Sequence, residues 1–216
     1  MAVSTTIAGG LFVTLEGPEG AGKTTQIELL GEALTSAGYA VLKTREPGGT
    51  PLGEQLRQLL MCRDGAPVAP EAELLLFGAS RAQHMRERIL PHLEQGGVVL
   101  CDRFLDSTTA YQGYARKLDM AFIAAMHDFS VCGRWPNLTF LLDISLEESR
   151  RRTRGRDGAA PNDRFEAEDN DFHRLVHAGF HDLARQFPQR FRVIDAERPA
   201  AAIAADILAE VRYALD

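Results

Sequence analysis

Short apolar runs alternate along the chain with longer segments in which apolar residues recur at helical spacing. The apolar runs predict strands over residues 11–15, 41–45, 98–101, 138–143 and 191–195. Strands separated by helical segments of this length are typical of a parallel sheet with right-handed crossovers. We therefore predict an α/β fold, an open doubly wound sheet of five parallel strands.

Local signals place the helices between these strands. The first helix carries apolar residues from Ile27 to Ala37, and Gly38 can end it in a left-handed conformation. Thr50 before Pro51 is a typical helix start. The apolar residues of that second helix share one face: Leu52, Leu56 and Leu59. Further helices are predicted over residues 71–94, 105–111, 119–132, 146–154, 169–187 and 199–214.

One segment breaks the pattern. Residues 155–162 (GRDGAAPN) are rich in Gly, Pro and Asn, lack apolar periodicity and follow a run of arginines. Such a segment predicts a mobile loop, and arginines at its edge suit a lid over a bound ligand. We expect a single domain over residues 1–216 with a lid at about 150–165.

Composition narrows the classes of partner. The chain has 216 residues, 45% of them apolar, and a net charge of −6. This acidic balance, without a basic tract, argues against nucleic acid or an anionic membrane as partner and favours a small ligand. Its first ten residues carry no Lys or Arg, and no run approaches the roughly 20 apolar residues of a membrane span. Cys62, Cys101 and Cys132 fit neither a disulfide framework nor a zinc site, so we expect a cytoplasmic protein.

A phosphate-binding motif follows the first predicted strand. Residues 17–24 (GPEGAGKT) match G-x-x-x-x-G-K-[ST] between a strand and a helix. Glycines let backbone amides surround phosphate oxygens, and the helix N-terminus adds partial positive charge. Lys23 would reach the β- and γ-phosphates. The residues expected to bind ATP are Gly17, Pro18, Glu19, Gly20, Ala21, Gly22, Lys23 and Thr24.

The motif also implies Mg²⁺. The Thr24 hydroxyl is the expected ligand, together with a carboxylate that ends a neighbouring strand, directly or through water. Asp102 is placed for this, and Arg103 beside it adds a phosphate-binding group. Asp143 also ends an apolar strand and is the alternative.

P-loop proteins include kinases, GTPase switches and ATPases, so accessory residues must separate them. The chain lacks the Asn-Lys-x-Asp element that reads guanine. Arg154 and Arg156 lie at the edge of the predicted lid and are our candidates for catalytic arginines. We expect the three arginines of 150–152 to complement a helix end and face solvent.

Several motifs together resemble the thymidylate kinase family. They are the P-loop with Glu19 inside it, TREPGGT at 44–50, LLLF at 74–77 leading to RAQ at 81–83, DRF at 102–104, DSTTAYQG at 106–113 and the arginine-rich segment. The resemblance covers most of the chain. It implies a P-loop nucleoside monophosphate kinase fold, ATP-dependent conversion of dTMP to dTDP, and a homodimer. A P-loop interior without a basic residue is similar to that of the bacterial members, whose catalytic arginine comes from the lid.

The resemblance also implies roles for the acceptor site. Phe77 would stack on thymine, Arg81 would donate to a base carbonyl, and Gln112 with Ser107 or Thr108 would meet the remaining polar edge. Tyr111 would lie against the sugar, and Glu19 would accept from the 3′-hydroxyl. Arg45 and Arg103 would hold the acceptor phosphate.

Two other functions remain open from the sequence. A deoxynucleoside kinase acting on thymidine would need a carboxylate base, for which Glu46 or Asp106 could serve, whereas a monophosphate kinase needs extra arginines. A nonenzymatic P-loop switch is the third possibility. We expect adenine near residues 196–199, beyond the last strand.

Three histidines share one helical stripe. His173, His177 and His181 are spaced four residues apart, which places the outer two about 12 Å apart along a helix. A single ion with bonds near 2 Å cannot bind all three, so we expect a solvated helix face.

Overall fold

The computed structural model describes residues 5–157 and 163–215, and within them five parallel strands form one sheet. The strands are β1 (Leu11–Glu16), β2 (Val41–Arg45), β3 (Val98–Asp102), β4 (Leu138–Asp143) and β5 (Phe191–Asp195). Their order is β2-β3-β1-β4-β5, so β1 is central. The predicted doubly wound α/β fold is confirmed.

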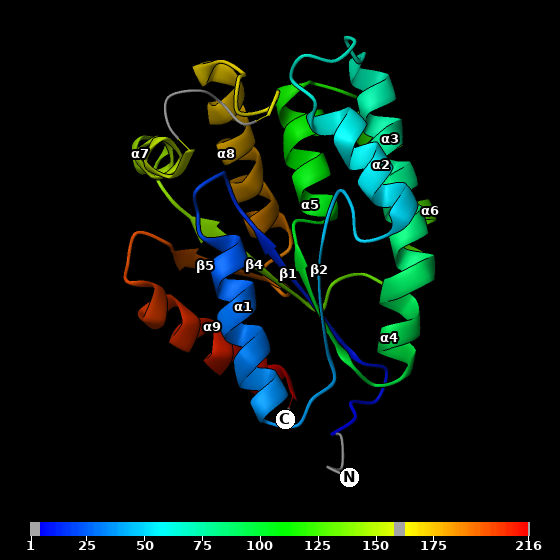
Figure 1. Cartoon of the computed structure of the whole chain (residues 1–216), viewed down its shortest axis with the longest axis vertical. Coiled ribbons are helices and arrows are strands. Elements are labelled where there is room, and N and C mark those ends of the chain that lie inside the picture. Colours follow the sequence, from blue (N-terminus) through cyan, green and yellow to red (C-terminus); the bar gives the residue numbers. More distant parts are fainter. Residues whose placement is uncertain (1–4, 158–162, 216) are drawn as a thin grey trace.

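Helices cover both faces of the sheet (Figure 1). The first and last, α1 (Lys23–Ser36) and α9 (Ala200–Leu215), pack together over one face. The remaining helical elements are α2 (Pro51–Met61), α3 (Pro70–His84), η1 (Met85–Ile89), α4 (Leu90–Glu94), α5 (Leu105–Thr108), η2 (Thr109–Ala115), α6 (Met120–Val131), α7 (Leu146–Asp157) and α8 (Asn170–Gln186). None of these described helices is long and apolar enough to cross a membrane.

Alternation along β1 divides the core between the two faces. Leu11, Val13 and Leu15 pack in the cluster that includes residues of α1 and α9. Phe12 points to the opposite face, where its ring lies 4.9 Å from that of Phe104. Burial on both faces requires apolar residues at successive positions, which is why the inner strands β1, β3 and β4 are nearly continuous apolar runs.

Most predicted boundaries agree with the structure, and α2 shows why. The Thr50 hydroxyl accepts a hydrogen bond from the amide of Gly53 (3.0 Å), and Pro51 occupies the first turn, where a missing amide hydrogen is harmless. Gly38 has a φ of 92°, as expected of a residue ending α1 in a left-handed conformation. The leucine face of α2 is exposed rather than buried, with Leu52 and Leu59 in contact with solvent.

Three predicted helices differ in detail. The helix expected over 71–94 is divided by the π-helical turn η1, which immediately precedes Leu90-Pro91. Proline removes a backbone donor and crowds the preceding turn, so the widened turn accommodates it. The helix expected to end at residue 111 continues through η2 to Ala115. α7 extends to Asp157, so the first three residues of the predicted mobile loop are helical, and the rest of that loop lies outside the described residues.

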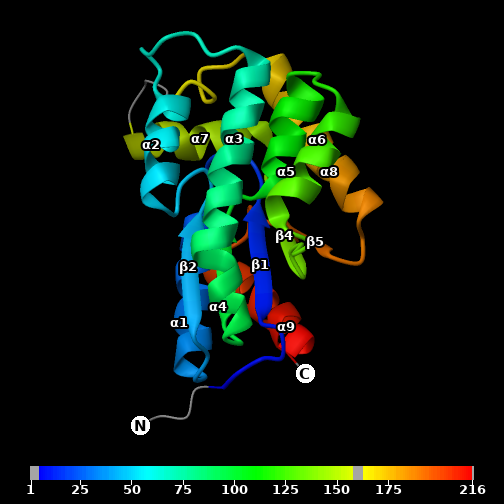
Figure 2. The ribbon, with the colours of Figure 1, turned by 90° about the vertical axis from the view of Figure 1, so that its right-hand side faces the viewer.

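The strand arrows point to the end of the molecule where α7 crosses (Figure 2). In the sheet register, Leu15 lies opposite Asp102 of β3 and Phe140 of β4. The loops that follow β1, β3 and β4 therefore meet at one edge, which is where open α/β sheets bind ligands.

A buried ion pair joins α5 to the residue before β5. Both terminal nitrogens of Arg190 donate to the Asp106 carboxylate (2.7 Å each), and one of them also donates to the Thr139 hydroxyl at 2.8 Å. Both charged side chains are buried. Removing one partner would leave the other charge buried without compensation.

We expect Arg190→Ala to lower the free energy of unfolding by about 3–5 kcal/mol, because Asp106 loses its counter-charge. Arg185→Ala is the matched control, since Arg185 pairs with Asp182 on the surface and should cost less than about 1 kcal/mol. Urea unfolding of both variants measures this difference. Equal losses of unfolding free energy in the two variants would contradict the larger contribution expected of the buried pair.

Candidate active site

The loop between β1 and α1 has the backbone geometry of a phosphate cradle. Gly17, Gly20 and Gly22 have φ values of 134°, 73° and 91°. A Cβ on Gly17 would lie 2.5 Å from the carbonyl oxygen of Leu142, so no larger residue fits beside β4. The first turn of α1 then leaves amide hydrogens without helical partners at the loop, and these attract anions.

Lys23 and Thr24 begin α1 with their side chains held in place. The Lys23 ammonium is buried and donates to the carbonyl oxygens of Gly17 (3.1 Å) and Pro18 (2.8 Å). Burial, and next the nearby charge of Arg103, lower the pKa of Lys23. A bound phosphate group would add negative charge beside this ammonium and favour its charged form.

The Thr24 hydroxyl donates to Asp102 Oδ2 at 2.7 Å, across the gap between α1 and β3. A hydroxyl and a carboxylate at hydrogen-bond distance form the oxygen donor set that Mg²⁺ prefers. The structure therefore favours Asp102 over Asp143 as the partner of Thr24. Asp143 instead accepts hydrogen bonds from His177 and His181 and is absent from the walls of both cavities described below.

A cavity of about 890 Å³ opens over the P-loop. Residues from the start of α1 form one side of it, and Asp102 and Arg103 form another. Ala196 and Arg198, from the segment expected to meet adenine, also line it, as do Ala200 and Ile203. This cavity has the position and size for a nucleotide whose phosphates reach the P-loop.

A second cavity of about 230 Å³ lies beside the first, between α3, α5 and η2. Most residues expected to bind the acceptor line it: Glu19, Phe77, Arg81, Arg103, Ser107, Thr108, Tyr111 and Gln112. Arg45 lines the first cavity instead, and its guanidinium donates to Glu54 Oε2 at 3.0 Å. The structure thus brings together side chains that are far apart in the sequence.

Arg103 lies where the two cavities meet. Both cavities share Glu19, Glu46, Arg57 and Arg103. The Arg103 guanidinium donates to the Gly17 carbonyl oxygen (2.9 Å), to Ser107 Oγ (3.1 Å) and to Glu19 Oε1 (2.5 Å). A ligand in either cavity would therefore contact the same cation.

Arg81 is held rigidly beneath the second cavity. It donates to Glu46 Oε2 (2.9 Å) and Thr108 Oγ1 (2.8 Å), and its third nitrogen lies 3.3 Å from His127 Nδ1. Burial, followed by the charges of Arg81 and Arg190, lowers the pKa of His127 to about 2. His127 is therefore neutral, and its Nδ1 accepts from Arg81.

Aromatic rings shape the other side of this cavity. Phe77 and Tyr111 each contact Phe165, with ring centroids 6.0 and 5.8 Å apart. Burial raises the pKa of Tyr111 to about 12, so its hydroxyl stays protonated. The Gln112 amide donates to Glu73 Oε1 at 2.7 Å, and this bond fixes the orientation of its side chain.

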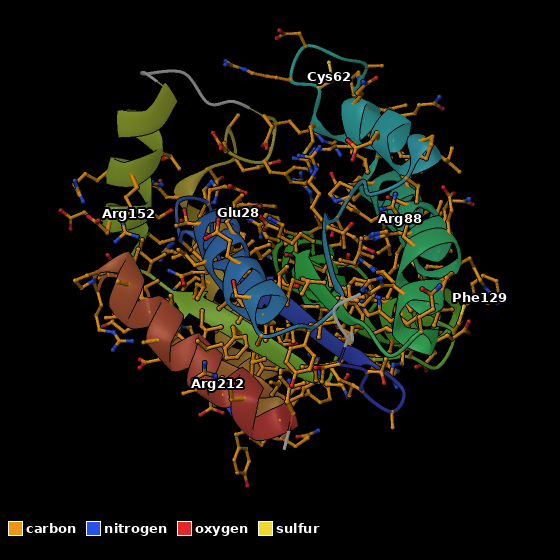
Figure 3. The ribbon with its side chains drawn as sticks, turned by 60° about the horizontal axis from the view of Figure 1, so that its bottom comes forward. Glu28, Cys62, Arg88, Phe129, Arg152 and Arg212 are labelled. Atoms are coloured by element: carbon orange, nitrogen blue, oxygen red, sulfur yellow. The ribbon has the colours of Figure 1, made fainter. Side chains whose placement is uncertain are left out.

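Among the arginines 150–152 of α7, two face solvent as predicted from the sequence and one does not. Arg151 pairs with Glu148 on the surface, and Arg150 bonds to Asn170, as expected of solvent-facing groups. Arg152 instead lines the P-loop cavity, where it bonds to Glu148 Oε1 (2.7 Å) and lies 3.5 Å from the Gly20 carbonyl oxygen. Figure 3 shows Arg152 on the segment that faces α1. The side chains of Arg154 and Arg156 lie outside the described part of the chain.

The sequence analysis did not predict three residues that line or support the two cavities. Arg57 lines both cavities, but nothing in the pattern of α2 distinguishes it from an exposed residue. Phe165 follows the segment expected to be a mobile loop, so no burial was expected there. Glu16 ends β1, and the rule that ligands bind at strand ends could have found it.

Comparisons with known proteins show which family the chain is similar to. The thymidylate kinase family model matches residues 15–207. The chain belongs to the thymidylate kinase family. Relatives named thymidylate kinase include one from Thermomicrobium roseum, 49% identical over 200 residues (93% of each chain), and one from Syntrophotalea carbinolica, 50% identical over 188 residues (86% of this chain and 87% of the relative).

A solved structure extends this similarity to the fold. The crystal structure of thymidylate kinase from Ehrlichia chaffeensis has a TM-score of 0.77 and 34% identity, covering 94% of this chain and 98% of that one. The expected thymidylate kinase family and fold are confirmed.

Glu16 is the buried carboxyl that ties β1 to α5. It accepts from the amide of Phe104 (2.8 Å) and from the hydroxyl of Ser107 (2.6 Å). Burial, followed by the nearby charge of Asp106, raises the pKa of Glu16 from 4.5 to about 7. Between these pH values the folded protein holds a proton that the unfolded chain has released, so stability falls as pH rises through this window.

We expect Glu16→Gln to remove this decline, because glutamine does not titrate. Between pH 4.5 and 7, wild type should lose on the order of 3 kcal/mol of unfolding free energy relative to the variant. Urea unfolding at several pH values measures the difference. Both proteins contain the same histidines, so the pH dependence that histidine titration contributes cancels in the comparison. Parallel profiles for the two proteins would refute the raised pKa.

Proposed function

We propose that this chain transfers the γ-phosphoryl group of ATP to dTMP, giving ADP and dTDP in the synthesis of dTTP. Membership of the thymidylate kinase family supports this activity. The observation that carries it is the pair of adjoining cavities that share Arg103, one over the P-loop and one lined by Phe77 and Tyr111. A donor and an acceptor nucleotide placed in them would meet at a common cation.

In this proposal the residues Gly17, Pro18, Glu19, Gly20, Ala21, Gly22, Lys23 and Thr24 bind ATP. Thr24 and Asp102 hold Mg²⁺, directly or through water, because their oxygens already lie 2.7 Å apart. When bound, Mg²⁺ neutralises charge on the β- and γ-phosphates and orients them. Ala196 and Arg198 lie where adenine would extend.

The second cavity takes dTMP. Phe77 stacks on thymine, Arg81 donates to a base carbonyl, and Gln112 with Ser107 or Thr108 meets the remaining polar edge. Tyr111 lies against the sugar, and Glu19 accepts from the 3′-hydroxyl. Arg45 and Arg103 hold the acceptor phosphate. The fixed orientations of Arg81 and Gln112 support these roles, because a preformed polar edge loses little entropy on binding.

The reaction needs no strong base. A phosphate monoester with a second pKa near 6 is largely a dianion at pH 7. One of its oxygens attacks the γ-phosphorus while the bond from that phosphorus to the β,γ-bridging oxygen breaks, and ADP leaves. The main barrier is repulsion between two anions, which Lys23, Arg103 and the lid residues Arg154 and Arg156 offset by positioned positive charge.

We further propose that residues 1–216 act as one domain with a lid at about 150–165, in the cytoplasm and without nucleic-acid or membrane partners. The pairing of α7 with the P-loop through Arg152 supports a lid at this position, since a movement of α7 would change the surroundings of the phosphates.

A coupled assay of ADP release, with dTMP, dUMP, thymidine or no acceptor, tests the activity. We expect turnover with the monophosphates dTMP and dUMP to exceed turnover with thymidine, because the arginines at the cavity boundary suit an acceptor that already bears phosphate. Fastest turnover with thymidine would indicate a nucleoside kinase instead. Hydrolysis that is independent of acceptor would indicate a switch or ATPase.

Lys23→Ala is the inactive control for this assay. It should reduce turnover by orders of magnitude, since the ammonium at the P-loop is lost, while unfolding stays cooperative. Arg151→Ala removes a surface arginine of α7 and should leave turnover near wild type.

The proposed homodimer would use the face formed by α2, α3 and α6, which pack side by side. Large apolar side chains are exposed there: Leu52, Leu59, Leu75, Met120, Phe122 and Phe129. Phe129 is 84% exposed and projects from the molecule in Figure 3. Large apolar side chains exposed on neighbouring helices typically mark an interface.

We expect sedimentation equilibrium to give twice the chain mass, and Phe122→Glu with Phe129→Glu to give a monomer, because the charges would be buried without partners. Tyr213→Glu is the control, since Tyr213 is 80% exposed on α9, outside this face. A wild-type monomer, or equal dissociation in both variants, would contradict the proposed interface.

A further inference from the structure

Two histidines of α8 and an aspartate of β4 form a compact cluster outside the proposed nucleotide sites. His177 and His181 are one turn apart on α8, and Asp143 ends β4. Nε2 of each histidine lies 3.0 Å from Asp143 Oδ1, and the three atoms lie within 4.8 Å of one another. The imidazole ring centroids are 4.6 Å apart.

This arrangement has the dimensions of a metal site. Bonds of about 2.0–2.1 Å from a tetrahedral zinc ion place its ligand atoms roughly 3.3 Å apart. The observed spacing therefore needs only small side-chain adjustments to enclose an ion. The three side chains are 31%, 31% and 33% exposed, so an ion could enter from solvent, and water could complete its coordination.

We propose that Asp143, His177 and His181 bind a divalent transition-metal ion of the zinc type. Two imidazoles with one carboxylate suit zinc or a neighbouring transition metal, whereas Mg²⁺ prefers oxygen ligands alone. Binding would use the Nε2 lone pairs with the ring protons on Nδ1, so the hydrogen bonds from Nε2 to Asp143 would be replaced by bonds to the ion.

The sequence obscured this site because it suggested a different set of ligands. The three histidines of the stripe cannot bind one ion together, as their spacing shows. The third ligand comes instead from a strand 34 residues earlier than His177. His173 lies beyond the cluster, with its ring against that of Phe172.

The cluster is separate from Thr24 and Asp102. Asp102 lies on β3 and Asp143 on β4, with β1 between them, and Leu15 is in register with both Asp102 and Phe140. Two strand spacings and three residues along the strand separate the two aspartates by about 14 Å. An ion here would be independent of the magnesium that accompanies ATP.

An ion at this position would tie α8 to the end of β4. Another face of α8 carries Phe172 and Phe180, whose rings lie 6.0 and 6.4 Å from that of Tyr111. The ion would therefore stabilise the helix that supports one wall of the second cavity. Its direct effect is on stability, which can be measured without substrates.

Titration of chelator-treated full-length protein with Zn²⁺, followed by calorimetry and thermal unfolding, tests the proposal. We expect one ion per chain and, at a free Zn²⁺ concentration of 100 times Kd, a rise in Tm of roughly 5–10 °C. His177→Asn and His181→Asn should each weaken binding at least tenfold and remove most of the rise. Co²⁺ bound to wild type should show the visible absorption of a tetrahedral site.

His173→Asn is the matched control, because it removes a histidine of the same stripe that does not reach Asp143. Cys62→Ser removes an exposed thiol that could bind zinc elsewhere. Both should bind Zn²⁺ like wild type. The proposal is wrong if wild type binds no stoichiometric Zn²⁺, or if His173→Asn or Cys62→Ser weakens binding as much as His177→Asn does. If the ligand variants fail to fold, shifts of the His177 and His181 ring resonances of wild type on Zn²⁺ addition decide the question, and unchanged resonances overturn it.

Discussion

The pairing of β1 with β3 on one side and β4 on the other determines where the charged groups of the site lie. Parallel strands end at one edge, so the loop after β1 must meet Asp102, which ends β3, and Arg103, which follows it. The bonds from Thr24 to Asp102 and from Arg103 to Gly17 close this junction. Both cavities open at it, so their positions follow from the order of the strands.

The two arginines at this junction are paired with carboxylates before any ligand binds. Arg103 pairs with Glu19, and Arg81 pairs with Glu46 while His127 stays neutral beside it. An isolated buried guanidinium would be strongly destabilising, whereas a paired and fully hydrogen-bonded one is tolerated. The same pairs fix the side chains in position, so the proposed nucleotide binding would require little reorganisation.

The sequence predicted those parts of the structure that depend on local signals. Strand positions, the capped start of α2 and the P-loop are readable because apolar period, turn residues and glycine positions act within a few residues. The family resemblance added Phe77, Arg81 and Gln112, which are otherwise indistinguishable from core residues. The sequence could not predict which residues bond to Arg81 and Gln112, because their partners Glu46 and Glu73 lie in distant segments of the chain. Arg152 was misjudged because its distance from Gly20 depends on how α7 packs, which helical spacing does not reveal.

The acidic composition and the phosphate-binding site are compatible because net charge and local field are different quantities. A polyanion such as nucleic acid needs a basic surface extending over many phosphates, which a chain of net charge −6 does not provide. A nucleotide needs positive groups only inside a cavity, and the P-loop cavity gathers them from every side: Lys23, Lys43, Arg45, Arg57, Arg88, Arg103, Arg152 and Arg198. Low-dielectric walls strengthen the field inside such a cavity, and the eight cations outnumber the five carboxylates that line it: Glu19, Glu28, Glu46, Glu54 and Asp102. The charge distribution is therefore compatible with the proposed small phosphate ligand, whereas the average charge of the sequence argues only against a large polyanionic partner.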